Sequence, residues 1–280
     1  MKQDLIRTDN ANLFWSLRSL DRPHKLYISG SSIIVEIPEF NGSSKKKIIF
    51  SESDLDLKTL GFIKSVKSDF KKSSIDPPKI NPSDVWFFFN NTEFPGTYHD
   101  VIEVDINTAY WELALKMGLI SQDIFYNGMI RKKEDRLIGL GSLATRKNVY
   151  EYDTQTGKYD YIESIQDERG RNAFFWVCAT LGDIMKRAID ESGARIMFFW
   201  VDAFFIRQAD LKKLAAFIHA QDLQFKVKPC SPMLVERINS GTSVKCLVGH
   251  EGEKSFFLPD KRQEGKTIKE IIDFVNSNIK

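Results

Sequence analysis

The sequence predicts an α+β protein in which a mainly antiparallel sheet carries helices on one face, preceded by a small N-terminal domain built from a β-hairpin and a helix. Its 280 residues are enough for one large domain or two small ones. From residue 100 onward the expected order is strand, helix, hairpin, long helix, hairpin, helix and strands, which is typical of α+β architectures. We expect an N-terminal domain and linker over residues 1–83, a main domain over 84–262 and a C-terminal helix over 263–280.

Two patterns predict the N-terminal domain. Residues 25–50 contain strand-like runs around the turn signal Asn41-Gly42, which indicates a hairpin. Residues 57–72 place Leu60, Val66 and Phe70 on one apolar stripe near helical spacing, with most of the lysines off it. A stretch containing three prolines follows over residues 73–83 and ends the helix. This stretch is the best domain boundary in the chain.

The main domain begins with an unbroken apolar run over residues 85–89, which predicts a strand buried on both faces. Residues 101–106 alternate instead, so Glu103 and Asp105 share one face of a strand. Residues 107–117 have helical composition and end before a glycine. A hairpin over 149–162 and a long amphipathic helix over 168–192 are expected next.

The last part of the chain is predicted to return to the sheet. Two very apolar strands flank a tight turn that contains Asp202. A helix is expected over residues 210–221. Short strand candidates follow at 223–227, 233–237, 244–248 and 254–258. An amphipathic helix over 267–278 is expected within the C-terminal range.

Composition narrows the classes of function. The chain has 40 Lys+Arg against 38 Asp+Glu, which excludes nucleic-acid binding through bulk positive charge but leaves a local basic face open. Its three cysteines show neither metal-ligand spacing nor a disulfide framework, so a reducing compartment, the cytoplasm, is expected. No apolar run approaches the roughly 18 residues that a membrane helix needs, so no membrane partner is expected.

Two acids are the main candidates for chemistry. Asp105 lies at the end of a strand, and Asp202 is the only charged residue between positions 196 and 206. An isolated carboxylate in such apolar surroundings is costly unless it is paired, hydrogen-bonded or bound to a cation. Acids on neighbouring strands could hold two Mg²⁺ ions about 4 Å apart, which activate a hydroxyl and stabilise a leaving pyrophosphate. The alternative is that Asp202 simply caps a hairpin turn.

A resemblance favours the first interpretation. Residues 105–110 read Asp-Ile-Asn-Thr-Ala-Tyr, which is similar to the first palm motif of family B DNA polymerases, Asp-x-Asn-Ser-x-Tyr, especially in the protein-primed phage and plasmid group. The long helix and residues 193–206 resemble the context of the third motif, where a helix leads to a strand, an Asp-Thr-Asp-Ser turn and a second strand. The resemblance covers about residues 85–260 and implies a polymerase-palm-like fold.

The resemblance also implies roles for individual residues. Asp105 and Asp202 would be catalytic and hold Mg²⁺ (or Mn²⁺), with Glu103 as an auxiliary ligand. Tyr110 would stack under the nucleotide sugar and exclude a 2′-hydroxyl. The nucleotide site would also include Asn107 and Arg136, the latter binding the incoming triphosphate. The partners implied are dNTPs, primer–template or single-stranded DNA, and other replication proteins.

The chain departs from the family pattern at several positions. Trp200 stands where the first Asp of the third-motif turn belongs, and Ala203 replaces its Ser. Trp111 replaces the Pro that usually follows the first-motif Tyr. The best match to the fingers motif, residues 136–144, lacks its Asn and Tyr. These departures favour the alternative of a catalytically inactive, palm-derived protein that binds nucleic acid or a replication partner.

Basic residues outside these motifs suggest DNA binding. Arg146 and Lys147 follow the run Gly-Leu-Gly-Ser-Leu-Ala at 139–144 and precede two tyrosines. Basic side chains bind phosphates and aromatic ones stack on unpaired bases, although a plain turn and a solvated, charge-mixed face explain the same pattern. Lys226 and Lys228 alternate on one strand, where they either contact a primer backbone or form an exposed face.

The function predicted from the sequence is template-dependent transfer of dNTPs to a 3′-hydroxyl. The small size favours a minimal replication or priming enzyme of a phage or mobile element, acting in the cytoplasm of a bacterial host. A third reading is a phage structural or host-interaction protein that merely has an α+β fold. Metal affinity at Asp105 and Asp202 separates the first reading from the others, and salt-dependent DNA binding separates the second from the third.

Overall fold

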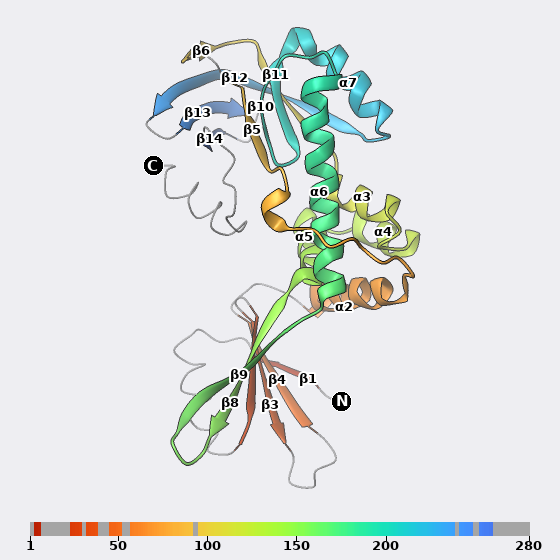
Figure 1. Cartoon of the computed structure of the whole chain (residues 1–280), viewed down its shortest axis with the longest axis vertical. Coiled ribbons are helices and arrows are strands. Elements are labelled where there is room, and N and C mark those ends of the chain that lie inside the picture. The colour runs from red at the N-terminus through yellow and green to blue at the C-terminus, as the bar shows by residue number, and fades with distance from the viewer. Residues whose placement is uncertain are drawn as a thin grey trace. The chain divides into compact units, whose positions relative to one another are not determined.

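The computed structural model describes residues 3–6, 23–29, 32–38, 45–51, 57–91, 95–238, 241–248 and 252–259. This part of the chain is an α+β protein with six α-helices and two sheets (Figure 1). It divides into two compact units: unit 1 comprises Met1–Lys72 and Glu134–Arg171, and unit 2 comprises Ser73–Lys133 and Asn172–Lys280. The helix expected over 263–280 lies outside the described residues.

Unit 1 is built on a six-stranded sheet with the order β1-β4-β3-β2-β8-β9. Neighbouring strands are antiparallel, except that β1 and β4 are parallel. The strands are β1 (Gln3–Ile6), β2 (Lys25–Ser29), β3 (Ser32–Pro38), β4 (Lys45–Ser51), β8 (Arg146–Asp153) and β9 (Lys158–Gln166). Leu26 of β2 pairs with Tyr150 of β8, and both pack in one hydrophobic cluster with Val35 and Ile37. The hairpin predicted within residues 149–162 therefore completes the N-terminal sheet of unit 1, whereas residues 73–83, which were expected in the N-terminal domain, belong to unit 2.

The helices of unit 1 pack through α2 (Leu57–Lys72), which spans the predicted residues and buries Phe62, Val66 and Phe70. Helix α5 (Lys133–Gly141) lies against it, since the Thr59 hydroxyl donates to Asp135 Oδ1 at 2.8 Å. The 3₁₀ turn η2 (Ser142–Ala144) then leads into β8. The glycine-containing run at 139–144 is thus a helix end and a turn.

Unit 2 contains an eight-stranded sheet with the order β14-β13-β12-β7-β11-β10-β5, in which β6 also pairs with β12. All of these pairings are antiparallel. Its strands are β5 (Phe88–Asn90), β6 (Gly96–Tyr98), β7 (Val101–Ile106), β10 (Ile196–Trp200), β11 (Ala203–Arg207), β12 (Phe225–Ile238), β13 (Gly241–Val248) and β14 (Glu253–Pro259). Its helices are η1 (Pro82–Asp84), α3 (Ala109–Lys116), α4 (Gln122–Met129), η3 (Gln208–Asp210), α7 (Leu211–Ala220) and most of α6 (Glu168–Glu191).

Four central strands and two helices of unit 2 follow a simple connection. Apart from the segment from α3 to β9, which lies between β7 and α6, the chain runs β7, α6, β10, β11, α7, β12, and these strands lie side by side in the order β12-β7-β11-β10. Helices α6 and α7 cover the same face. Lys186 of α6 lies over the ring of Phe89, which stacks on Phe199, and His219 of α7 contacts Phe225 beside Ile106. The predicted antiparallel sheet with helices on one face is therefore present here.

The opposite face of the sheet curls onto itself and becomes nearly closed, like a barrel. Asn90 Nδ2 of β5 donates to Thr242 Oγ1 of β13 at 3.0 Å, across the two ends of the sheet. Phe256 of β14 contacts Phe198 and Phe205 with ring centroids 5.6 and 5.1 Å away. The enclosed core is mostly aromatic, aliphatic and sulfur-containing side chains.

The apolar run at residues 85–89 differs from its prediction. Only Phe88–Asn90 forms a strand, β5, and it lies at the edge of the sheet rather than within it. Val85 instead closes the 3₁₀ turn η1 through its amide, and the Phe87 carbonyl accepts a hydrogen bond from the turn between β10 and β11. Local hydrophobicity predicted the burial of Val85 and Phe88 but not the position of this segment in the sheet.

No helix in the described part of the chain is both long and apolar enough to cross a membrane.

Candidate functional site

Glu103 and Asp105 lie on β7, which has β11 on one side and β12 on the other. Asp105 is opposite Ala203 in β11 and Lys226 in β12. Glu103 is opposite Phe205 and Lys228. Alternation along β7 directs both acids to the curled face, as the sequence predicted. Both carboxylates are buried.

The turn between β10 and β11 brings Asp202 to the end of β7. The amide of Ile106 donates to the carbonyl of Asp202 at 2.9 Å, which ties the turn to the residue after Asp105. The other turn residue, Val201, has a φ of 58°, a backbone region that favours glycine and is costly for a β-branched side chain. The Val201 amide donates to Phe87 at 2.7 Å, so neighbouring backbone holds the strained turn in place.

The electrostatics of Asp202 reflect these surroundings. Burial raises the pKa of the Asp202 carboxyl above its ordinary value, and the negative charge of Asp105 raises that pKa further. Lys133 and Lys226 act in the opposite direction. Tyr110, near the start of α3, lies close enough to respond to Asp202. Burial first, then the charges of Cys178 and Asp202, raise the pKa of its hydroxyl.

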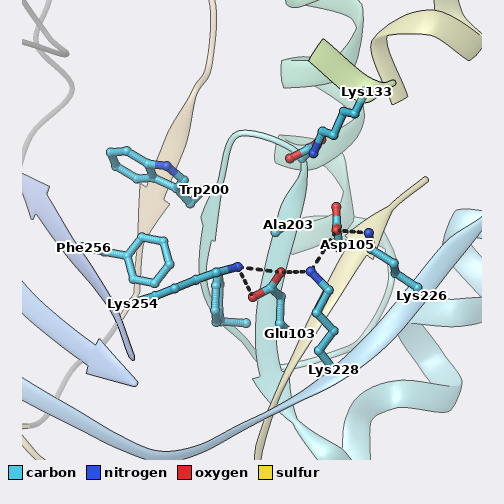
Figure 2. A pocket seen from close by; sticks show the side chains of 11 residues that line it. Glu103, Asp105, Lys133, Trp200, Ala203, Lys226, Lys228, Lys254 and Phe256 are labelled. Atoms are coloured by element: carbon cyan, nitrogen blue, oxygen red, sulfur yellow. Dashed lines mark hydrogen bonds and ion pairs between the residues drawn. The ribbon is translucent and has the colours of Figure 1, made fainter. Parts of the chain in front are cut away.

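Three lysines bind the two acids of β7 (Figure 2). Lys226 Nζ lies 3.0 Å from Asp105 Oδ2, and Lys228 Nζ lies 3.4 Å from the same oxygen. Lys228 also reaches Glu103 Oε1 at 3.3 Å, while Lys254 of β14 reaches Glu103 Oε2 at 3.2 Å. A buried carboxylate is tolerated when it is paired in this way. The predicted DNA-binding residues Lys226 and Lys228 therefore lie inside the acid site.

These residues line one cavity of about 300 Å³. Its ionisable lining consists of three carboxylates and four lysines, Lys133 included. Trp200 and Phe256 form an aromatic wall on another side, with ring centroids 5.9 Å apart (Figure 2). Trp200 also stacks on Phe88. Trp200 thus places a large aromatic ring at this end of the cavity, next to the turn that carries Asp202.

The other predicted site residues lie elsewhere or contribute through the backbone. Arg136, Arg146 and Lys147 belong to unit 1, on α5 and β8. Arg146 is exposed and its Nε donates to the Ser164 hydroxyl. Asn107 follows β7 directly, and its amide donates to the carbonyl of Gln224 at 2.8 Å. That bond fixes the start of the turn that leads to α3.

Sequence reasoning missed Lys254 and Phe256 as site residues. Both lie on β14, a strand predicted from residues 254–258, but nothing in the local sequence connects that strand to Glu103. Their position depends on the antiparallel return of β13 and β14 across the curled face. Lys133, at the start of α5, was likewise not predicted as a site residue. The cations that neutralise Glu103 can be identified only when the order of the strands in the sheet is known.

The metal-binding capacity of the site is limited. Within the described ranges, no group of three or more His, Cys, Asp or Glu side chains is arranged to hold a metal ion. Asp105 and Asp202 provide two carboxylates, and the negative charge of Asp105 disfavours the ionisation of Asp202. Mg²⁺ commonly binds through one or two carboxylates together with water and substrate phosphates. The donor set therefore fits an ion that arrives with a phosphorylated substrate better than a permanently caged one.

Comparison with known proteins adds no assignment. No protein-family model matches this chain, and no curated protein matches it at a significant level. Any function must therefore be argued from the geometry and chemistry of the site.

Proposed function

We propose that this protein catalyses metal-dependent nucleotidyl transfer, adding deoxynucleotides to the 3′-hydroxyl of a DNA primer on a template. The observation that carries the proposal is the meeting of Asp105 and Asp202 in one lysine-rich cavity, at the ends of adjacent strands. Two acids raise the local negative charge, and four lysines supply partners for a triphosphate.

In the proposed reaction, each of the residues that line the cavity would have its own role. Asp105 and Asp202 would hold the divalent cation, whose chemistry is to activate the hydroxyl and neutralise charge on the phosphates. Lys226 and Lys228 would exchange their carboxylate partners for phosphate oxygens when substrate binds. Trp200 and Phe256 provide faces on which a base stacks. Tyr110, buried beside Asp202, would contact the sugar.

The topology of unit 2 agrees with this proposal. When the segment from α3 to β9 between β7 and α6 is set aside, the order β7-α6-β10-β11-α7-β12 is a β-α-β-β-α-β arrangement, which agrees with the antiparallel sheet and one-sided helices expected of a palm-like fold. It places the ends of β7 and of the β10–β11 turn together, which is where the two acids lie. This agreement is support at the level of fold, and fold alone does not decide function.

Primer extension tests the proposal. A labelled primer–template is incubated with dNTPs and Mg²⁺ or Mn²⁺, and the full chain is compared with Asp105→Ala and Asp202→Ala. Each substitution is expected to lower incorporation by at least about 10²–10³-fold, because charge stabilisation at the reacting phosphate is lost. Asp183→Ala, an exposed acid on α6 outside the cavity, is the control and should retain activity.

A second candidate function has its own support. Glu103 and Asp105 are already paired with lysines, so the same cavity also suits a palm-derived protein that binds DNA without catalysis. A folded chain that binds primer–template but incorporates nothing with either metal would overturn the catalytic proposal and favour this one. Incorporation that is equal in wild type and Asp202→Ala would show that the activity, if present, uses another site.

A further inference from the structure

A second basic cavity lies within unit 1. It has a volume of about 270 Å³ and is formed by α2, the turn after α5, and the β8–β9 hairpin. Its polar lining consists of Lys67, Lys71, Ser142, Thr145, Lys147 and Asp167. Only Lys147 among these was a predicted DNA-binding residue.

The charges in this cavity do not balance. Three ammonium groups face one carboxylate, which leaves an excess of two positive charges. That carboxylate also has a structural task, because Asp167 Oδ1 accepts from the Gly170 amide at 3.1 Å and caps α6. Within the part of the chain that the structure describes, the three lysines form no salt bridge with another residue.

Gathering these lysines is unfavourable when the cavity is empty. Lys67 and Lys71 are one turn apart on α2, where like charges destabilise a helix. Burial and the charges of Lys147 and Lys71 lower the pKa of Lys67, although Asp167 acts in the opposite direction. An anion in the cavity would remove this repulsion. The arrangement is therefore that of a site for an oxyanion with several donors around it.

We propose that this cavity binds a phosphate group of a nucleic-acid strand. Lysine ammonium groups are common donors to phosphate oxygens, and the Thr145 hydroxyl adds a neutral donor. The same hairpin favours a strand over a free phosphate, because a strand that leaves the cavity would also meet exposed Arg146, on the opposite face of β8 from Lys147, and the half-exposed ring of Tyr161 on β9. Basic groups that track a backbone and aromatic rings that stack on bases are the usual means of binding single strands. This proposal does not depend on catalysis at Asp105 and Asp202.

Binding of a fluorescent oligo-dT by the full chain tests the proposal across a range of salt concentrations. The variant Lys67→Gln/Lys71→Gln/Lys147→Gln is expected to bind about tenfold more weakly, and its log–log salt slope should fall by about 0.7 or more. The matched control, Lys58→Gln/Lys72→Gln, removes exposed lysines from the same helix outside the cavity and should bind nearly as wild type. A single charge reversal, Lys71→Glu, should reproduce the loss.

Three results would overturn the proposal. One is an unchanged affinity and salt slope in the triple variant. Another is an equal loss in the Lys58/Lys72 control, which would indicate general charge attraction. The third concerns the source of the phosphate. If the triple variant binds inorganic phosphate or dATP more weakly than wild type but binds oligo-dT equally well, the cavity binds a free phosphate or nucleotide instead of a strand. A lower melting temperature in the triple variant would contradict the claim that repulsion among the three lysines destabilises the empty cavity. In that case the affinity of Lys71→Glu for oligo-dT is the test of the binding proposal.

Discussion

At the residue scale, Asp202 is held in a state that resists ionisation. Burial is the larger cause and the negative charge of Asp105 the next, and both raise the pKa of the carboxyl. The folded chain therefore binds more protons at this position than the unfolded chain between the ordinary and the raised pKa. By linkage, its contribution to folding stability falls as pH rises through that window. A carboxylate kept at such a cost is typical of a site that binds a cation or charged substrate.

This linkage makes a prediction for Asp202→Asn. The variant should be more stable than wild type at neutral pH, and should lack this residue's decline in stability between mildly acidic and neutral pH, because its side chain does not ionise. Urea unfolding at several pH values measures both effects, with Asp183→Asn as the exposed-acid control. An Asp202→Asn variant that is less stable at neutral pH would mean that the carboxylate serves the fold rather than a ligand.

At the element scale, α6 passes very close to the chain just before β5. A Cβ atom added at Gly182 would lie 2.5 Å from the Trp86 carbonyl oxygen, a backbone atom that cannot rotate away. This contact positions the helix over the sheet face that carries Phe89 and Phe199. The glycine is therefore required by packing, since its helical backbone needs no special φ. Gly61 on α2, in contrast, has nothing within 4 Å of such a Cβ.

Replacement of Gly182 and of Gly61 by alanine is expected to change the free energy of unfolding in opposite directions. Gly182→Ala should lower the free energy of unfolding by about 1–3 kcal/mol, the usual cost of overpacking. Gly61→Ala should raise it by about 1 kcal/mol, because alanine is the better helix former at an open position. Chemical denaturation of the two variants and wild type measures both changes. Equal stability of Gly182→Ala and wild type would mean that α6 is not held against Trp86 as described.

At the scale of the whole molecule, the sheet of unit 2 uses its two faces differently. One face packs on α6 and α7, and the other curls around an aromatic core and ends in the acid-and-lysine cavity. Lys226 and Lys228, which pair with the acids of β7, lie on β12, the direct neighbour of that strand, whereas Lys254 lies on β14, which the curl brings across. Closure of the sheet therefore completes the site by adding Lys254 to Glu103.

Ligand linkage should report on this site through the stability of the whole chain. Mg²⁺ together with a dNTP is expected to raise the melting temperature of wild type, since a ligand at about 100 times its dissociation constant stabilises the fold by about 2.7 kcal/mol. Asp105→Asn should reduce the Mg²⁺-dependent part of the rise. A scan with each ligand alone and with both separates the contributions. An unchanged response in Asp105→Asn would place nucleotide binding outside the cavity of β7.

The sequence by itself determined the local elements of this protein. Period and composition predicted α2, α6 and the β7, β10 and β11 strands near their observed limits, because amphipathic spacing reflects local geometry. The alternation along β7 predicted that Glu103 and Asp105 lie on one face. The apolar strands around Asp202 indicated that burial of its carboxylate costs free energy unless it is paired or bound to a cation. These features depend only on residues close together in the chain.

Only the tertiary structure decided which elements lie side by side and which side chains come into contact. It placed the β8–β9 hairpin with the N-terminal strands, reduced the run at 85–89 to a short edge strand, and brought Lys254 from β14 to Glu103. It also showed that Lys226 and Lys228, expected either to contact a primer backbone or to form an exposed face, pair with the acids of β7. Strand order and sheet curvature depend on contacts between residues far apart in sequence, and no local pattern records them.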